Sequence, residues 1–71
     1  MSLAVTAWRL VKSGQRATCI VSQRDGRWQV MVEEGKRVTI AERCASDDAA
    51  FERANQIWKV LADHGWAEPH H

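Results

Sequence analysis

Apolar and polar residues alternate along residues 5–44, and short polar segments that contain glycine interrupt the alternation three times. Alternation with a period of two is typical of strands that bury one face. The interruptions are Ser13-Gly14, Asp25-Gly26 and Glu33-Glu34-Gly35. We therefore expect four antiparallel strands that follow one another in a β-meander.

The lengths of the turns decide which side chains share a face, because opposite residues in antiparallel strands point the same way. We expect two-residue turns at the first two interruptions. With a three-residue third loop, one face collects an apolar set: Trp8, Leu10, Ala17, Cys19, Val21, Trp28, Val30, Val32, Val38 and Ile40. A three-residue second turn, Arg24-Asp25-Gly26, is the alternative; it would reverse the first two strands and bury Ile20 instead.

The third connection is expected to be the loop Glu33-Glu34-Gly35, with Gly35 in a left-handed conformation and a bulge beside it. This loop pairs Val30 with Val38. The predicted face therefore requires these two valines to lie in the same layer.

A helix is predicted over residues 47–64. Ser46 is a good N-cap, and Asp47 follows it at the positive end of the helix dipole. Gly65 ends the helix in the manner of a Schellman motif. One stripe of the helix is apolar at helical spacing: Ala50, Phe51, Ala54, Ile57, Trp58 and Leu61.

These elements predict an α+β fold in a single domain, residues 1–71. A four-stranded antiparallel meander (about 5–44) carries one C-terminal helix (about 47–64) on its apolar face, as a two-layer sandwich, and a short tail (65–71) follows. His70 and His71 are left out of the functional argument because they are either native residues or the start of a purification tag.

One helix is narrower than the sheet it must cover. A helix is about 10–12 Å wide, whereas four strands span roughly 15 Å between the outer axes. We expect Trp8 and Leu10, on an edge strand, to stay uncovered unless strong twist or Trp66 covers them. A second subunit would cover the same residues, so we expect a symmetric homodimer.

Composition and charge narrow the range of functions. The chain has 71 residues and a formal net charge of +1, so no strong overall field attracts nucleic acid or anionic lipid. Eight basic and four acidic side chains give residues 1–46 a charge of +4, and two basic and five acidic side chains give residues 47–71 a charge of −3. No apolar run is long enough to cross a bilayer, and we expect no membrane partner.

The outer face of the sheet carries the candidate chemistry, and three interpretations of it stay open. It is a solvated surface, a basic platform for a polynucleotide backbone, or a self-association patch. The phosphate-binding residues of the basic platform would be Arg24, Arg27, Arg37 and Arg43. The self-association patch would be centred on Ile20, Met31 and Ala41.

Three segments resemble the plant ethylene-response-factor DNA-binding domain, over about residues 20–62: Gly26-Arg27-Trp28-Gln29-Val30, Gly35-Lys36-Arg37-Val38 and Ser46-Asp47-Asp48-Ala49-Ala50. Arm-binding domains of phage integrases have a similar pattern. The resemblance implies that the outer sheet face contacts DNA through Arg37 and, approximately, Arg24, with Trp28 in the core. Other contact positions of that family hold Asp25, Met31, Glu33 and Thr39 here. The order of elements is also similar to small dimeric single-strand-binding coactivators.

Catalytic and metal-binding patterns are weak. Cys19 and Cys44 fall on strands two apart, in no spacing typical of zinc ligands, and we expect inert free thiols in a reducing cytoplasm. His64 is the internal histidine and falls at the end of the helix. We therefore expect no enzyme, no cofactor and no metal.

The expected function is a small non-catalytic binding module, cytoplasmic and homodimeric, whose outer face contacts nucleic acid. The alternative is a protein-interaction or homo-oligomeric assembly domain. In that case the Ile20–Met31 patch or the edge at Trp8 would dock another chain.

Overall fold

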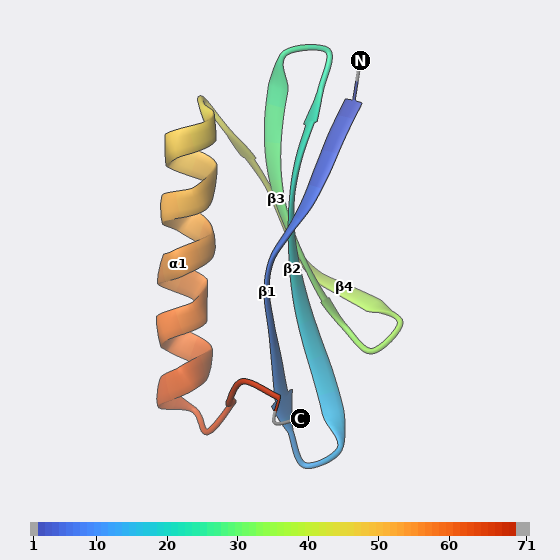
Figure 1. Cartoon of the computed structure of the whole chain (residues 1–71), viewed down its shortest axis with the longest axis vertical. Helices are drawn as coiled ribbons and strands as arrows, with labels where there is room; N and C mark the ends of the chain where they lie inside the picture. Colours follow the sequence, from blue (N-terminus) through green and yellow to red (C-terminus); the bar gives the residue numbers. More distant parts are fainter. Residues whose placement is uncertain (1, 70–71) are drawn as a thin grey trace.

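The computed structural model describes residues 2–69, and His70 and His71 lie outside them. The chain forms β1 (Ser2–Lys12), β2 (Gln15–Arg24), β3 (Arg27–Glu34), β4 (Arg37–Cys44) and α1 (Asp47–Asp63). The strands pair antiparallel in the order β1-β2-β3-β4, and α1 packs against one face of the sheet (Figure 1). The predicted α+β meander with one C-terminal helix is confirmed.

The first two turns are the predicted two-residue turns. Both of their central residues have positive φ, 51° at Ser13, 80° at Gly14, 53° at Asp25 and 75° at Gly26. Positive φ at both positions is typical of the type I′ turn, whose twist suits a β-hairpin. The register that follows is the expected one from Trp8 to Lys12 of β1, in β2 and in the paired part of β3, and Ile20 lies on the outer face. Before Trp8, a bulge at Ala7 shifts the register of β1 by one residue.

The third turn differs from the expectation. Glu34 pairs with Arg37, so the turn has two residues, and the register shifts by one residue just beyond it, at Thr39. Beyond this β-bulge the extra residue restores the expected faces of β4, whereas between the turn and the bulge the two-residue turn reverses them. As a result Val38 lies on the outer face, 50% exposed, in the layer opposite Val30, so the predicted Val30–Val38 pair is wrong.

Ile40 still faces the helix, because the bulge restores its parity. It pairs with Val32, not with Trp28 as the three-residue loop would require. The shorter turn and the added bulge residue thus cancel in their effect on which face Ile40 takes. They do not cancel for the residues between the turn and the bulge.

The core lies between the sheet and α1. Its fully or almost fully buried side chains come from the three strands β1–β3 and from the helix: Leu10, Ala17, Cys19, Val21, Val30, Val32, Ala50, Ala54 and Ile57. Each strand residue in this set belongs to the face predicted from the alternation. Phe51, expected on the buried stripe of the helix, is 43% exposed.

The expectation that Trp8 and Leu10 stay uncovered is wrong. Leu10 is completely buried, and Trp8 is half-buried, with its indole Nε1 donating a hydrogen bond to the Ala54 carbonyl at 2.8 Å. The tail after the helix returns to β1, where Val11 and Ala67 exchange two backbone hydrogen bonds of 2.7 and 3.0 Å. Twist and the tail together cover this end of the strand.

The twist leaves a different corner of the sheet uncovered. The helix meets the second half of β1 at Trp8 and the second half of β4, where Arg53 forms an ion pair of 2.9 Å with Glu42. The first half of β1 turns away from α1 (Figure 1). Leu3 and Val5 therefore stay 50% and 40% exposed although they point to the helix side of the sheet.

Both ends of α1 are capped as predicted. The Ser46 hydroxyl accepts a hydrogen bond from the Ala49 amide at 3.2 Å. At the other end the Trp66 amide donates to the Leu61 carbonyl, and the Gly65 amide donates to Ala62, which is the Schellman pattern. Gly65 adopts φ of 93°, a conformation that favours glycine.

Candidate nucleic-acid interface

The outer face of the sheet carries a cluster of arginines at the end where β2 turns into β3. Arg24 pairs with Arg27 on either side of the Asp25-Gly26 turn. One row further along, Gln29 lies between Ser22 on β2 and Arg43 on β4. Because opposite residues in antiparallel strands point to the same side, these side chains all project from the outer face.

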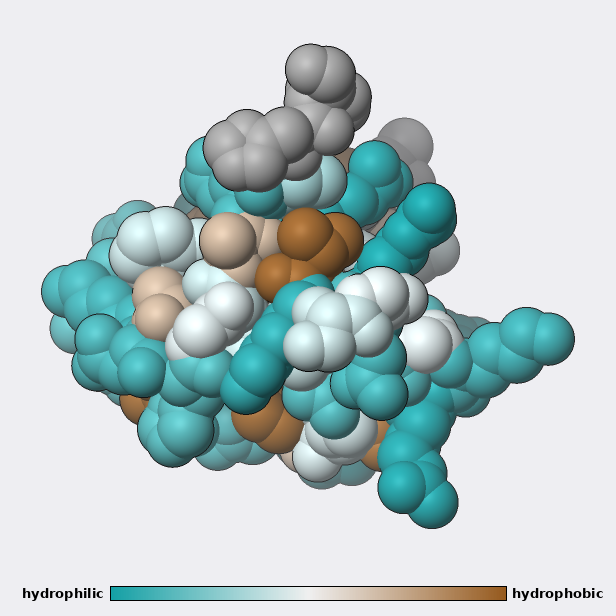
Figure 2. Space-filling model, turned by 90° about the horizontal axis from the view of Figure 1, so that it is seen from below, coloured by the Kyte–Doolittle hydropathy of each residue, from teal (hydrophilic) through white to brown (hydrophobic). Residues whose placement is uncertain are grey.

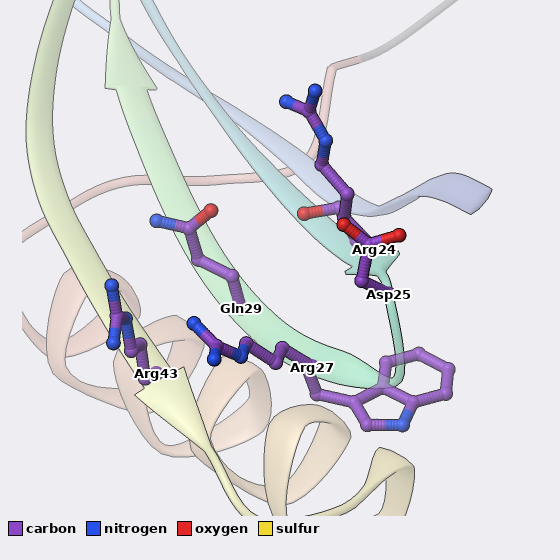
Figure 3. Close-up of a pocket in the computed structure, with 7 residues that line it drawn as sticks. Arg24, Asp25, Arg27, Gln29 and Arg43 are labelled. Atoms are coloured by element: carbon purple, nitrogen blue, oxygen red, sulfur yellow. The ribbon is translucent and has the colours of Figure 1, made fainter. Parts of the chain in front are cut away.

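The cluster surrounds an open depression of about 440 Å³, lined by Ser22, Arg24, Asp25, Arg27, Trp28, Gln29 and Arg43. Figure 3 shows Arg27 and Arg43 extending into the same space beside Gln29, whereas Arg24 projects from the end of β2, apart from these two side chains. The depression thus has two guanidinium groups at its centre and a third at its rim.

None of the three arginines has an ion-pair partner among residues 2–69, where the ion pair present joins Arg53 to Glu42. All three are exposed. Asp25 is the one acidic residue that lines the depression, so three positive charges stand against one negative charge. A guanidinium group presents five N–H donors in a planar fork that matches phosphate oxygens.

Arg37 does not belong to this cluster. The two-residue turn places Arg37 opposite Glu34, which in turn pairs with Ala17 of the buried face. Arg37 therefore points to the helix side of the sheet. Its partner Glu34 ends β3, whereas Arg27 begins that strand. At 3.4 Å per residue, the two arginines are therefore roughly 24 Å apart along the sheet. Arg37 lines a separate depression of about 480 Å³, together with Gly14, Gln15, Arg16, Glu34 and Gly35.

The expected outer-face position of Arg37 was therefore wrong, and its physical reason is the two-residue turn, whose effect the bulge compensates only beyond Thr39. The structure brings Arg24, Arg27 and Arg43 together and separates Arg37 from them. Gln29 and Ser22 complete the site as uncharged hydrogen-bonding groups. Register alone would have found them, because they share a row with Arg43.

The apolar patch predicted on the outer face is small. Ile20, Met31 and Ala41 lie side by side in one row across β2, β3 and β4. The first two are partly buried among their neighbours. Trp8, the other residue expected to dock a partner, points into the domain and is hydrogen-bonded to the helix.

The end of the molecule that carries the Gly14 and Gly35 turns is mainly hydrophilic. Viewed from this end, its apolar residues form small areas separated by polar side chains (Figure 2). This surface differs from the first half of β1, where two exposed apolar residues lie two positions apart.

The two cysteines are free thiols. Cys19 is completely buried, and this burial raises the pKa of its thiol from 9.0 to about 11. The thiol is therefore protonated at neutral pH and a weak nucleophile. Cys44 is half-buried. It lies opposite Trp28 of β3, whereas Cys19 lies opposite Val32 of the same strand, so the two cysteines are at different positions along the sheet.

His64 completes the end of the helix and lies far along the chain from the arginine cluster. Its Nδ1 is 2.7 Å from the Val60 carbonyl oxygen, and Lys12 Nζ donates to the His64 carbonyl at 2.6 Å. Across residues 2–69 no three His, Cys, Asp or Glu side chains gather in a way that would hold a metal ion.

Within the described part of the chain, α1 lacks the length and apolar character that a membrane crossing requires. Comparison with known protein families, curated proteins and solved structures found no match to this chain. The likeness to ethylene-response-factor domains therefore rests on the three segments of sequence that suggested it.

Proposed function

We propose that this chain is a small non-catalytic binding domain that contacts the phosphate backbone of a nucleic acid through Arg24, Arg27 and Arg43. The observation that carries the proposal is the group of three exposed guanidinium groups around one depression, without ion-pair partners among residues 2–69. Hydrogen bonds between guanidinium groups and phosphate are charge-assisted and often bidentate.

The distribution of charge between the two layers supports this orientation. The β part of the chain carries a charge of +4, from eight basic and four acidic residues in 1–46. The helix and tail carry −3, from two basic and five acidic residues in 47–71. An approaching polyanion is therefore attracted to the sheet and repelled by the helical layer, which orients the encounter toward the outer face.

The chemistry of the outer face favours double-stranded over single-stranded nucleic acid. Sequence-independent binding of single strands uses aromatic side chains on which bases stack. Trp28 lines the depression but, like Trp8, lies on the helix side of the sheet, whereas Trp58 and Phe51 belong to the helix and Trp66 to the tail. Arginine, glutamine and serine side chains instead suit phosphate and sugar oxygens, which a duplex presents on its outside.

Two further expectations accompany this proposal. The free thiols fit a reducing compartment, and we place the domain in the cytoplasm. The homodimer expected from the sequence is a separate proposal, because a different surface carries it.

The test is a titration of fluorescently labelled 20-base-pair duplex and single strand with the wild-type protein and Arg43→Glu, at several salt concentrations. Arg43→Glu removes one phosphate contact and adds a repulsive charge. We expect it to weaken duplex binding about tenfold and to lower the slope of log K against log salt by about 1.

Arg37→Glu is the matched control, since it makes the same charge change on the same strand outside the cluster. We expect its affinity and salt slope to stay close to those of the wild type. Circular dichroism shows that both variants are folded. Equal effects of the two substitutions, or no binding by the wild-type protein at low salt, would contradict the proposed site.

A further inference from the structure

The first half of β1 is an open edge of the sheet. β1 pairs with β2 on one side, and on its other side the tail bonds to it at Val11, through Ala67. Residues 2–6 precede the bulge at Ala7 and have no further strand beside them among residues 2–69. Their outward backbone N–H and C=O groups are therefore available to a further strand.

This edge lacks the charged residues that normally prevent strand addition. Residues 2–7 read Ser-Leu-Ala-Val-Thr-Ala and contain no charge and no proline, and the first charged residue of β1 is Arg9. The opposite edge, β4, contains Arg37, Glu42 and Arg43 and is interrupted by a bulge. Charges and bulges protect sheet edges from pairing, so β4 is protected and the start of β1 is not.

The same segment exposes apolar side chains on one face. Leu3 and Val5 point to the helix side, where α1 does not reach them, and they are 50% and 40% exposed. In an antiparallel pair of identical strands centred on Ala4, Leu3 of each copy lies opposite Val5 of the other. This arrangement covers all four side chains at once and is self-complementary, as a two-fold interface requires.

We propose that two copies of this chain pair antiparallel along residues 2–6 of β1, with Ala4 near the two-fold axis. The two sheets then join into one, with both helices on the same face. The paired segment carries no charged side chain, so it brings no like charges into direct contact along the new strand pair. The proposal does not depend on nucleic-acid binding, since it uses the edge and the helix side of β1.

The expected affinity is modest. A standard interface takes about 800 Å² from each partner, whereas the five-residue edge is only about 17 Å long. A dimer of this size is expected to have a Kd between about 1 µM and 1 mM. In sedimentation equilibrium, the weight-average mass should rise from 8.1 kDa toward twice that value between about 1 and 500 µM protein.

Two substitutions test the interface. Leu3→Lys and Val5→Lys each place charges of like sign close together across the axis, and we expect each to raise the Kd at least about tenfold. Val60→Lys is the matched control, because Val60 is 54% exposed near the end of the helix that bonds to the last residues of β1, not to residues 2–6, and should leave the Kd unchanged. Circular dichroism verifies that each variant keeps its secondary structure.

Ala4→Cys, in a Cys44→Ala background, tests the register. Directly opposite residues in antiparallel strands have Cα atoms about 4.5–5.5 Å apart, within the range for a disulfide. Mild oxidation should therefore give a covalent dimer with an unchanged circular dichroism spectrum. A wild-type chain that stays monomeric to 500 µM, a dimer insensitive to Leu3→Lys and Val5→Lys, or no cross-link would overturn the proposal.

Discussion

Cys19 and Trp8 show how individual residues hold the two layers together. Cys19 lies in the centre of the buried face with no exposed area, and it acts as a small apolar side chain. Trp8 packs against the core and satisfies its one polar atom with the Ala54 carbonyl of the helix, 2.8 Å away. Burial of an indole requires such a partner, because an unpaired N–H in the core would cost free energy.

The Cys19 thiol predicts a specific pH dependence of stability. Its pKa is about 11 in the folded chain and 9.0 at its ordinary value. Below pH 9 both states hold the proton, so the thiol contributes no pH dependence. Between pH 9 and 11 the unfolded state loses the proton while the folded state keeps it. The free energy of unfolding then falls as pH rises, by at most about 1.4 kcal/mol per pH unit from this group.

Urea unfolding at several pH values between 8 and 11 measures this effect. Cys19→Ala is the comparison, because it removes the thiol and keeps a small apolar side chain. The difference in unfolding free energy between wild type and Cys19→Ala should shrink as pH rises. A difference that is independent of pH would show that burial does not raise the thiol pKa.

At the scale of elements, the β3–β4 connection shows where prediction from sequence ends. The helix, its caps and the first two hairpins follow from local signals, since Asp25-Gly26 and Ser46 specify their geometry within a few residues. The third turn contains Gly35 in a run of polar residues that suits turns of two or three residues. Its outcome depends on the bulge at Thr39, which no local signal marks.

The candidate site was predictable to the same extent. Arg24 and Arg27 flank the two-residue turn Asp25-Gly26 that the sequence favours, so their common face follows from that prediction. Arg43 lies beyond the bulge and keeps the expected face because the shorter turn and the extra residue compensate. Arg37 lies before the bulge, and there the compensation is absent.

The N-cap of α1 predicts a measurable contribution to stability. Ser46→Ala removes the oxygen that accepts from the Ala49 amide, 3.2 Å away, and should lower the free energy of unfolding by about 1 kcal/mol. Ser46→Asp should keep most of that stability, since aspartate also caps helices. Urea denaturation monitored by tryptophan fluorescence measures both, and equal losses in the two variants would exclude a capping role.

At the scale of the whole molecule, the two layers differ in charge and in what they expose. The helix buries the apolar face of the sheet and carries four of the nine acidic residues, whereas the sheet presents Arg24, Arg27 and Arg43 on the free side. The arginine cluster lies at one end of the outer face, and the open edge of β1 lies beside it. In the proposed dimer, both arginine clusters would lie on the same side of one continuous sheet.

Chemical-shift mapping of the isotope-labelled protein during titration with a 20-base-pair duplex tests the proposed nucleic-acid interface most directly. The proposal predicts that the backbone amides of Ser22, Gln29 and Arg43 shift most, together with those of the Asp25-Gly26 turn. Amides of α1 should stay in place. Shifts centred on Arg16 and Arg37 at the opposite end, or none at low salt, would contradict it.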